Sequence, residues 1–154
     1  MPVNYYSGTI EDVQAVLRNV RVGENRISDI SQIDVEKFQK EADAIINSIL
    51  LPLFRTPLFK ITRNGETTYP HPIPYIATRI VASLIQQSVY SEIEPNTSEN
   101  TTDMGDKAIR ELKDFVAGIL KGSRGLEGQR LKARNRFVNP RAAPNEAPPD
   151  RTSL

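Results

Sequence analysis

Apolar residues recur every three or four positions through most of residues 9–120, and this repeat then stops. Such a repeat places apolar side chains on one face of a helix, which must be buried against another element. The chain of 154 residues is long enough to bury one such core. After Gly122 the repeat is absent, and four of the eleven prolines fall within residues 140–149. We therefore expect a helical body over residues 1–124 and an extended, basic and proline-rich arm over residues 125–154.

Caps and apolar stripes predict the first two helices. Thr9 and Asp12 have the spacing of an N-cap and the third helical residue after it. Asp34 or Ser31 is the expected cap of the second helix, and Pro52 should end or kink that helix because proline has no amide proton. The first stripe consists of Ile10, Val13, Val16, Leu17 and Val20. The second stripe consists of Val35, Phe38, Ala42, Ile45, Ile46, Ile49 and Leu50, and the charged residues off that stripe are Glu36, Lys37, Lys40, Glu41 and Asp43.

A short hairpin is predicted between Phe59 and Tyr69. The residues on each side alternate in polarity around Asn64-Gly65, a pair that tolerates the positive φ angles of a type I′ turn.

The third predicted helix starts at Pro74 and stops before Pro95, and its composition is unusual. Arg79 is the only charged residue between Pro74 and Ser91, although a solvated helix face normally carries more charge. We infer that this helix is covered on two sides, either at the centre of the bundle or at an interface between subunits. The core stripe is Ile73, Ile76, Ala77, Ile80, Val81, Leu84 and Ile85. The residues predicted for a ring interface are Thr78, Arg79, Ala82, Ser83 and Gln86.

A polar loop over residues 96–102 leads to the last predicted helix, which Asp103 and Asp106 can cap and which Lys121 and Gly122 close. Its stripe is Met104, Ala108, Leu112, Phe115, Val116 and Ile119. The expected fold is therefore mostly α: a small four-helix bundle with a short β-hairpin between the second and third helices.

Residues that carry catalysis or bind cofactors are scarce. The only histidine is His71, in a predicted loop between two prolines, and an enzyme using it is the weakest of three functional hypotheses. Gly122 to Gly125 lack the spacing of a phosphate-binding loop. One histidine and no cysteine leave only carboxylates for a metal, without calcium-loop spacing. The carboxylate pairs Glu11 with Asp12, Glu41 with Asp43, and Glu92 with Glu94 are expected on solvated faces. We expect no enzyme, cofactor or metal.

The absence of cysteine indicates a reducing compartment, with the cytosol as the default. The longest apolar runs are far shorter than the ~18 residues of a membrane span, and residues 1–8 lack the regions of a signal peptide. Membrane insertion and export are therefore not expected.

The arm begins with the most distinctive segment of the chain. Residues 121–141 carry a net charge of +6, whereas residues 1–120 carry −4. Within the arm the bases alternate with other residues, as expected of an extended strand with its charges on one edge. Three interpretations of the arm remain open at this point: a solubilising tail, a nucleic-acid arm, or a peptide that orders on a protein partner. The bases are Arg130, Lys132, Arg134 and Arg136, and the apolar anchors are Leu131 and Phe137.

The order of these elements from Tyr5 to Leu126 resembles the small helical head–tail connector (adaptor) proteins of tailed bacteriophages, which bind beneath the portal. The family's second helix has an Ala-acid-x-Ile-x-x-x-Leu run, which is similar to residues 42–50 here, followed by Arg55 and Pro57-Leu58. Its proline-opened helix, rich in Ile and Ala, is similar to residues 74–82. Its last helix matches at Leu112, Phe115, Ala117 and Gly118, whereas Pro52 departs from the family pattern.

The resemblance implies a structural protein of the virion, assembled in the host cytoplasm. It implies a ring of twelve copies that contacts the portal, neighbouring copies and a tail-side protein, with DNA passing through the channel without sequence-specific binding. It also implies that the C-terminal arm reaches the portal and adjacent subunits. A nucleic-acid-binding protein that uses the basic arm is the alternative.

Overall fold

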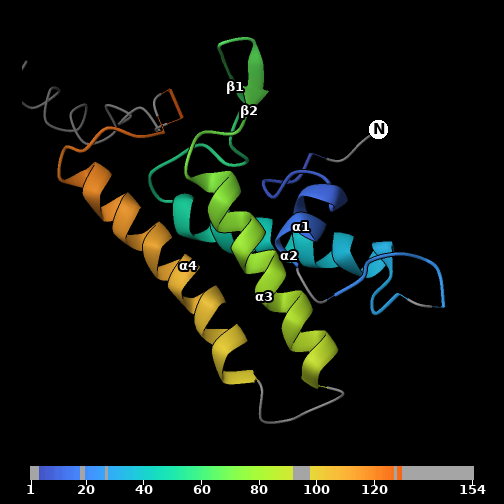
Figure 1. Ribbon diagram of the computed structural model, residues 1–154. Coiled ribbons are helices and arrows are strands. Elements are labelled where there is room, and N and C mark those ends of the chain that lie inside the picture. Colours follow the sequence, from blue (N-terminus) through green and yellow to red (C-terminus); the bar gives the residue numbers. More distant parts are fainter. Residues whose placement is uncertain (1–3, 18–19, 27, 92–97, 127, 130–154) are drawn as a thin grey trace, which may run out of the picture.

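The computed structural model describes residues 4–17, 20–26, 28–91, 98–126 and 128–129. The fold is a bundle of four helices with an antiparallel hairpin between the second and third (Figure 1). The described elements are α1 (Ile10–Val16), α2 (Gln32–Leu50), β1 (Ile61–Arg63), β2 (Glu66–Thr68), α3 (Ile73–Ser91) and α4 (Ser98–Leu120). This architecture confirms the predicted fold class.

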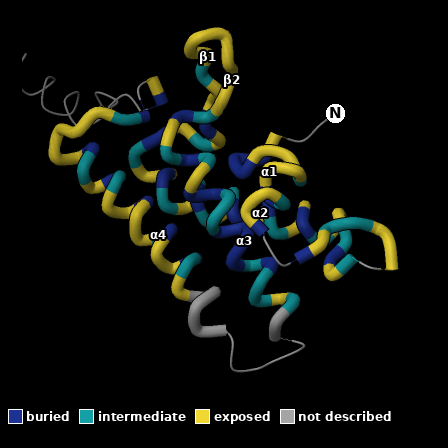
Figure 2. Tube along the Cα trace, in the orientation of Figure 1, coloured by how far each residue is buried: buried dark blue, intermediate teal, exposed yellow. Residues whose placement is uncertain are grey.

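α3 is the central helix. It packs most extensively on α4 and also contacts α2 and α1. Figure 1 shows α3 and α4 running in opposite directions, with α2 crossing behind them. The tube in Figure 2 shows burial along most of α3, whereas α4 alternates between buried and exposed residues. The central position of α3 in the bundle thus accounts for its low charge.

The ends of the helices follow local signals. Thr9 and Asp12 form the predicted capping box of α1. The side chain of Ser31 caps α2, which ends at Leu50 just before Pro52. At the end of α4, Gly122 has a φ of +107°, and the Ser123 N–H donates to the Gly118 carbonyl at 3.0 Å. This is the Schellman arrangement that glycine favours.

The hairpin has the predicted turn. Asn64 and Gly65 have φ angles of +52° and +83°. In the antiparallel pair of β1 and β2, Thr62 lies opposite Thr67. The hairpin projects from the bundle, and Figure 2 shows it as mostly exposed.

Three expectations differ from the structure in detail. α4 begins at Ser98, inside the segment expected to be a loop. α1 ends at Val16, whose side chain is 43% exposed, so this residue does not join the core stripe. Buried residues of α2 include Gln39, a polar side chain that the stripe omitted.

Candidate functional site

The binding residues predicted for the arm lie outside the described residues. They are Arg130, Leu131, Lys132, Arg134, Arg136 and Phe137. The structure does describe the point where the arm leaves the body. Gln129 is 3% exposed, and its carbonyl accepts the Arg55 N–H at 2.8 Å. Its side-chain amide accepts the Phe59 N–H and donates to the Phe59 carbonyl, both at 2.9 Å. Gln129 therefore fixes the root of the arm beside the segment that leads into the hairpin.

The residues before Gln129 also belong to the body. Leu126 is 2% exposed, and a Cβ added at Gly125 would lie 2.7 Å from the Phe115 ring. A side chain at position 125 would therefore force the Phe115 ring of α4 to move. Leu126 and Gln129 belong to the segment expected to form the arm, and the structure packs both against the body.

The residues predicted for a ring interface divide into two groups. Ala82 and Ser83 are buried within the chain, whereas Thr78, Arg79 and Gln86 are partly exposed. Ser83 lies so close to α4 that a Cβ on Gly105 would be 2.6 Å from its Oγ. The helices approach closely here because position 105 has no side chain.

Arg79 lies between α3 and α4. Its guanidinium pairs with the Glu111 carboxylate at 2.6 Å and sits over the Tyr75 ring at 5.2 Å from the ring centroid. Both contacts orient the guanidinium along the surface of the bundle.

A row of polar residues on α2 holds the N-terminal segment, residues 4–8. Gln39, Asp43 and Asn47 are spaced four apart, so they lie on one face of the helix. The Gln39 amide donates to the Ser7 hydroxyl at 2.9 Å, and Asp43 accepts the Tyr6 N–H at 3.2 Å.

Tyr6 links this row to the loop before the hairpin. Its hydroxyl donates to the side-chain Oδ1 of Asn47 at 2.6 Å and accepts the buried Leu58 N–H at 2.8 Å. The Tyr6 ring also meets the Tyr69 ring edge-on, with centroids 4.8 Å apart. Sequence reasoning missed this row, although the spacing of four beside an apolar stripe was the signal that could have found it.

Asp43 is not on a solvated face, contrary to the expectation for its pairing with Glu41. Burial raises the pKa of Asp43 to about 6, and the hydrogen bond from the Tyr6 N–H opposes that shift. Burial also raises the pKa of the Tyr6 and Tyr69 hydroxyls, and the nearby Asp43 charge adds to the rise. The Asp43 carboxylate therefore lies in a poorly solvated site, where it accepts a hydrogen bond from the Tyr6 backbone.

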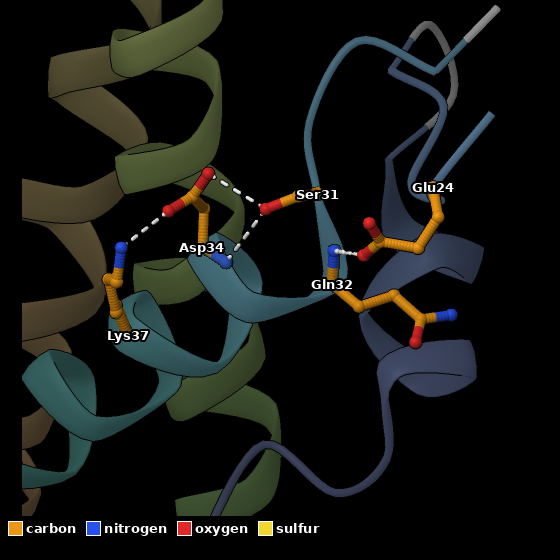
Figure 3. Close-up of polar contacts among 5 residues, drawn as sticks. All are labelled: Glu24, Ser31, Gln32, Asp34 and Lys37. Carbon is orange, nitrogen blue, oxygen red and sulfur yellow. Dashed lines mark hydrogen bonds and ion pairs between the residues drawn. The ribbon is translucent and has the colours of Figure 1, made fainter. Parts of the chain in front are cut away.

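A groove of about 670 Å³ lies where the loop before α2 meets α2 and the end of α3. Figure 3 shows the polar contacts at its edge. The Ser31 hydroxyl accepts the Asp34 N–H, Asp34 pairs with Lys37 at 2.7 Å, and Glu24 accepts the Gln32 N–H at 3.3 Å. The charged residues that line the groove are Glu24, Asp29, Asp34, Lys37 and Glu41. This lining is predominantly acidic.

The other candidate residues are dispersed. His71 is exposed in the turn before α3, and Glu11 is exposed on α1, while Asp12 serves as a cap. Glu92 and Glu94 lie outside the described residues. Across the described ranges, no group of three or more His, Cys, Asp or Glu is placed to hold a metal ion. No helix in the described part of the chain is long and apolar enough to cross a membrane.

No protein-family model, curated protein or solved structure matches this chain.

Proposed function

We propose that this chain is a structural head–tail adaptor of a tailed bacteriophage that acts without catalysis. In this proposal twelve copies form a ring beneath the portal, extend the channel through which DNA passes, and link the capsid vertex to a tail-side protein. The chain would be assembled in the host cytoplasm and function at the head–tail interface of the virion.

The observation that carries this proposal is the fixed exit point of the arm. Three hydrogen bonds attach Gln129 to Arg55 and Phe59, so the basic segment begins at a defined place on a compact helical body. A linking protein needs such a geometry, because a tether of defined origin presents its binding residues to a neighbour in a restricted volume.

The acidic groove at the start of α2 supports a contact between copies. Figure 1 shows the loop before α2 and the end of the described chain on opposite sides of the molecule. Arg130 lies one residue from the anchored Gln129, and at ~3.3 Å per residue the basic segment spans only ~23 Å to Arg136. We infer that the segment binds the groove of an adjacent copy, whose acidic lining offers complementary charge.

The partly exposed residues of α3 supply a second surface for packing in a ring. Thr78, Arg79 and Gln86 lie on the part of α3 that the other helices leave partly open. Ala82 and Ser83 are already buried in the chain, so a ring contact would form around the first three residues.

The alternative function is nucleic-acid binding, which the alternating bases of the arm favour. An arm that releases counterions from ~6 phosphates should show a log–log salt dependence with a slope near −5 on duplex DNA. A protein-binding arm should instead leave duplex DNA largely unbound at physiological salt.

The test replaces Arg130, Lys132, Arg134 and Arg136 by Gln. The matched control replaces four exposed bases of the body by Gln and thus changes the net charge equally: Lys107, Arg110, Lys113 and Lys121. Negative-stain imaging of each protein with the cognate portal measures ring formation, and circular dichroism measures folding.

We expect both variants to fold and only the arm variant to lose most of its portal binding. Residual binding of the arm variant should be less sensitive to salt and should disappear on Phe137→Ala. Equal ring formation by the two variants would contradict the proposal, and a slope near −5 on DNA would favour the alternative.

A further inference from the structure

A second groove, of about 410 Å³, lies between the N-terminal segment, the hairpin and the start of α3. Four of the five tyrosines of the chain line it: Tyr5, Tyr6, Tyr69 and Tyr75. Tyr5 and Tyr6 lie more than 60 residues before Tyr69 and Tyr75 in the sequence, so the groove exists only in the folded chain.

The four tyrosines of the groove differ in exposure: Tyr5 and Tyr6 are buried, Tyr69 is partly buried and Tyr75 is exposed. Tyr6 and Tyr69 hold each other edge-on, and Lys60 lies over the Tyr69 ring at 5.3 Å. Tyr75 is 59% exposed and Val16 is 43% exposed, and both line the groove. Among the lining residues, these two side chains offer the apolar surface that an occupant could cover.

A groove lined by aromatic rings is the surface that recognises proline-rich segments. Such segments adopt the polyproline II conformation, which has no internal hydrogen bonds and is already extended before binding. This chain contains a segment of that composition, with Pro140, Pro144, Pro148 and Pro149 within ten residues.

We propose that the proline-rich segment, residues 138–150, binds the tyrosine-lined groove of its own chain in the free protein. The described chain ends at Gln129, which is bonded to Phe59, and the next residue, Lys60, lines the groove. Pro140 lies eleven positions after Gln129, a distance of up to ~36 Å when the chain is extended.

The tether favours this occupant over a separate partner. A linker of this length gives its attached segment an effective concentration up to the millimolar range, so a weak proline–aromatic affinity is sufficient for binding. The proposal does not depend on the adaptor function, because it concerns the isolated chain only.

The absence of cysteine makes a direct test possible. A nitroxide attached to Ala143→Cys is the only label on the chain, and its effect on backbone amides is read by NMR. We expect the amides of Thr67, Thr68, Tyr75 and Thr78 to lose most of their intensity, and to regain it when the nitroxide is reduced.

Two variants and one control identify the contact. Replacing the four prolines by Ala should abolish the intensity loss. These replacements leave every residue up to Gln129 unchanged. Tyr75→Ser should also abolish it, whereas Leu120→Ser, which alters an equally exposed apolar residue of α4, should preserve it.

Three results would overturn the proposal. One is full amide intensity in the labelled protein, and another is an intensity loss that persists after the proline replacements. The third is an intensity loss in a mixture of two proteins, one with the nitroxide but no ¹⁵N and the other with ¹⁵N but no nitroxide. The occupant of the groove would then be a second copy.

Discussion

The α3–α4 pair and the N-terminal segment are both well buried, but different interactions hold them. α3 and α4 meet through periodic apolar side chains such as Ile80 and Leu112, which follow directly from helical spacing. The N-terminal segment is irregular, and polar side chains of α2 hold its backbone, with Asp43 accepting the Tyr6 N–H. Apolar contact is therefore sufficient to pair regular helices. An irregular segment needs individual hydrogen bonds, because its backbone groups have no partners of their own.

The largest effect is expected in the helical pair. Ile80→Asp should unfold the body, with a loss of more than about 4 kcal/mol in the free energy of unfolding, because it buries an unpaired charge. Thermal melting followed by circular dichroism measures the loss. Ala117→Asp, at an exposed position of α4, is the control and should melt near the wild-type temperature.

The next effect is expected in the N-terminal segment. Tyr6→Phe should cost about 1–3 kcal/mol in urea unfolding, since it leaves the buried Leu58 N–H without its acceptor. Tyr75→Phe is the matched control, because Tyr75 is largely exposed. A cost for Tyr6→Phe no greater than that of the control would show that packing alone holds this segment.

The close approach of α3 and α4 makes a prediction with an unusual sign. Gly105→Ala should destabilise by about 1–3 kcal/mol, although alanine normally stabilises a helix by about 1 kcal/mol relative to glycine. The cost should shrink in the Ser83→Ala background, which removes the nearest atom. Gly118→Ala is the control, because its added Cβ would meet Ser123 at an ordinary 3.6 Å. Stabilisation by both alanines would refute the close approach.

The root of the arm should respond locally. Gln129→Ala should cost about 0.5–1.5 kcal/mol and speed hydrogen exchange at the Phe59 amide, which loses its acceptor. Gln32→Ala, at an exposed position of α2, should leave that exchange rate unchanged. Unchanged exchange in Gln129→Ala would mean that this side chain does not fix the root.

The smallest effect is expected for Asp43→Asn, whose difference from the wild type in melting temperature should be negligible at low pH and grow as pH rises. Its folded pKa is raised to about 6 from 3.8, so the folded state binds more protons than the unfolded chain between pH 4 and 6. The contribution of this group to stability therefore falls as pH rises through that window. Asp43→Asn should melt at the same temperature as the wild type near pH 4 and at a higher temperature than the wild type at pH 7. Melting curves whose separation does not change with pH would contradict the raised pKa.

The helices and several of their ends were predictable because their signals are local, whereas the start of α4 at Ser98 and the end of α1 at Val16 were not. Thr9, Ser31, Pro52 and Gly122 act within one turn of their own positions, and the structure uses each of them as expected. The hairpin turn at Asn64-Gly65 was predictable for the same reason.

The candidate site was predictable only in part. The low charge of α3 indicated a helix at the centre of the bundle or at an interface, and the structure shows α1, α2 and α4 packed on it, with Thr78, Arg79 and Gln86 left partly exposed. The burial of Gln39 and Asp43 was missed because their partners lie more than thirty residues away in the sequence.

The sequence by itself determined the secondary structure of the body and the side of each helix that is buried, since both depend on spacings of three and four residues. Only the tertiary structure decided where the N-terminal segment lies, that Leu126 and Gln129 pack against the body, and that four tyrosines meet in one groove. The physical reason is that these features rest on single contacts between distant segments. Such contacts form only after the apolar faces have packed and brought those segments together.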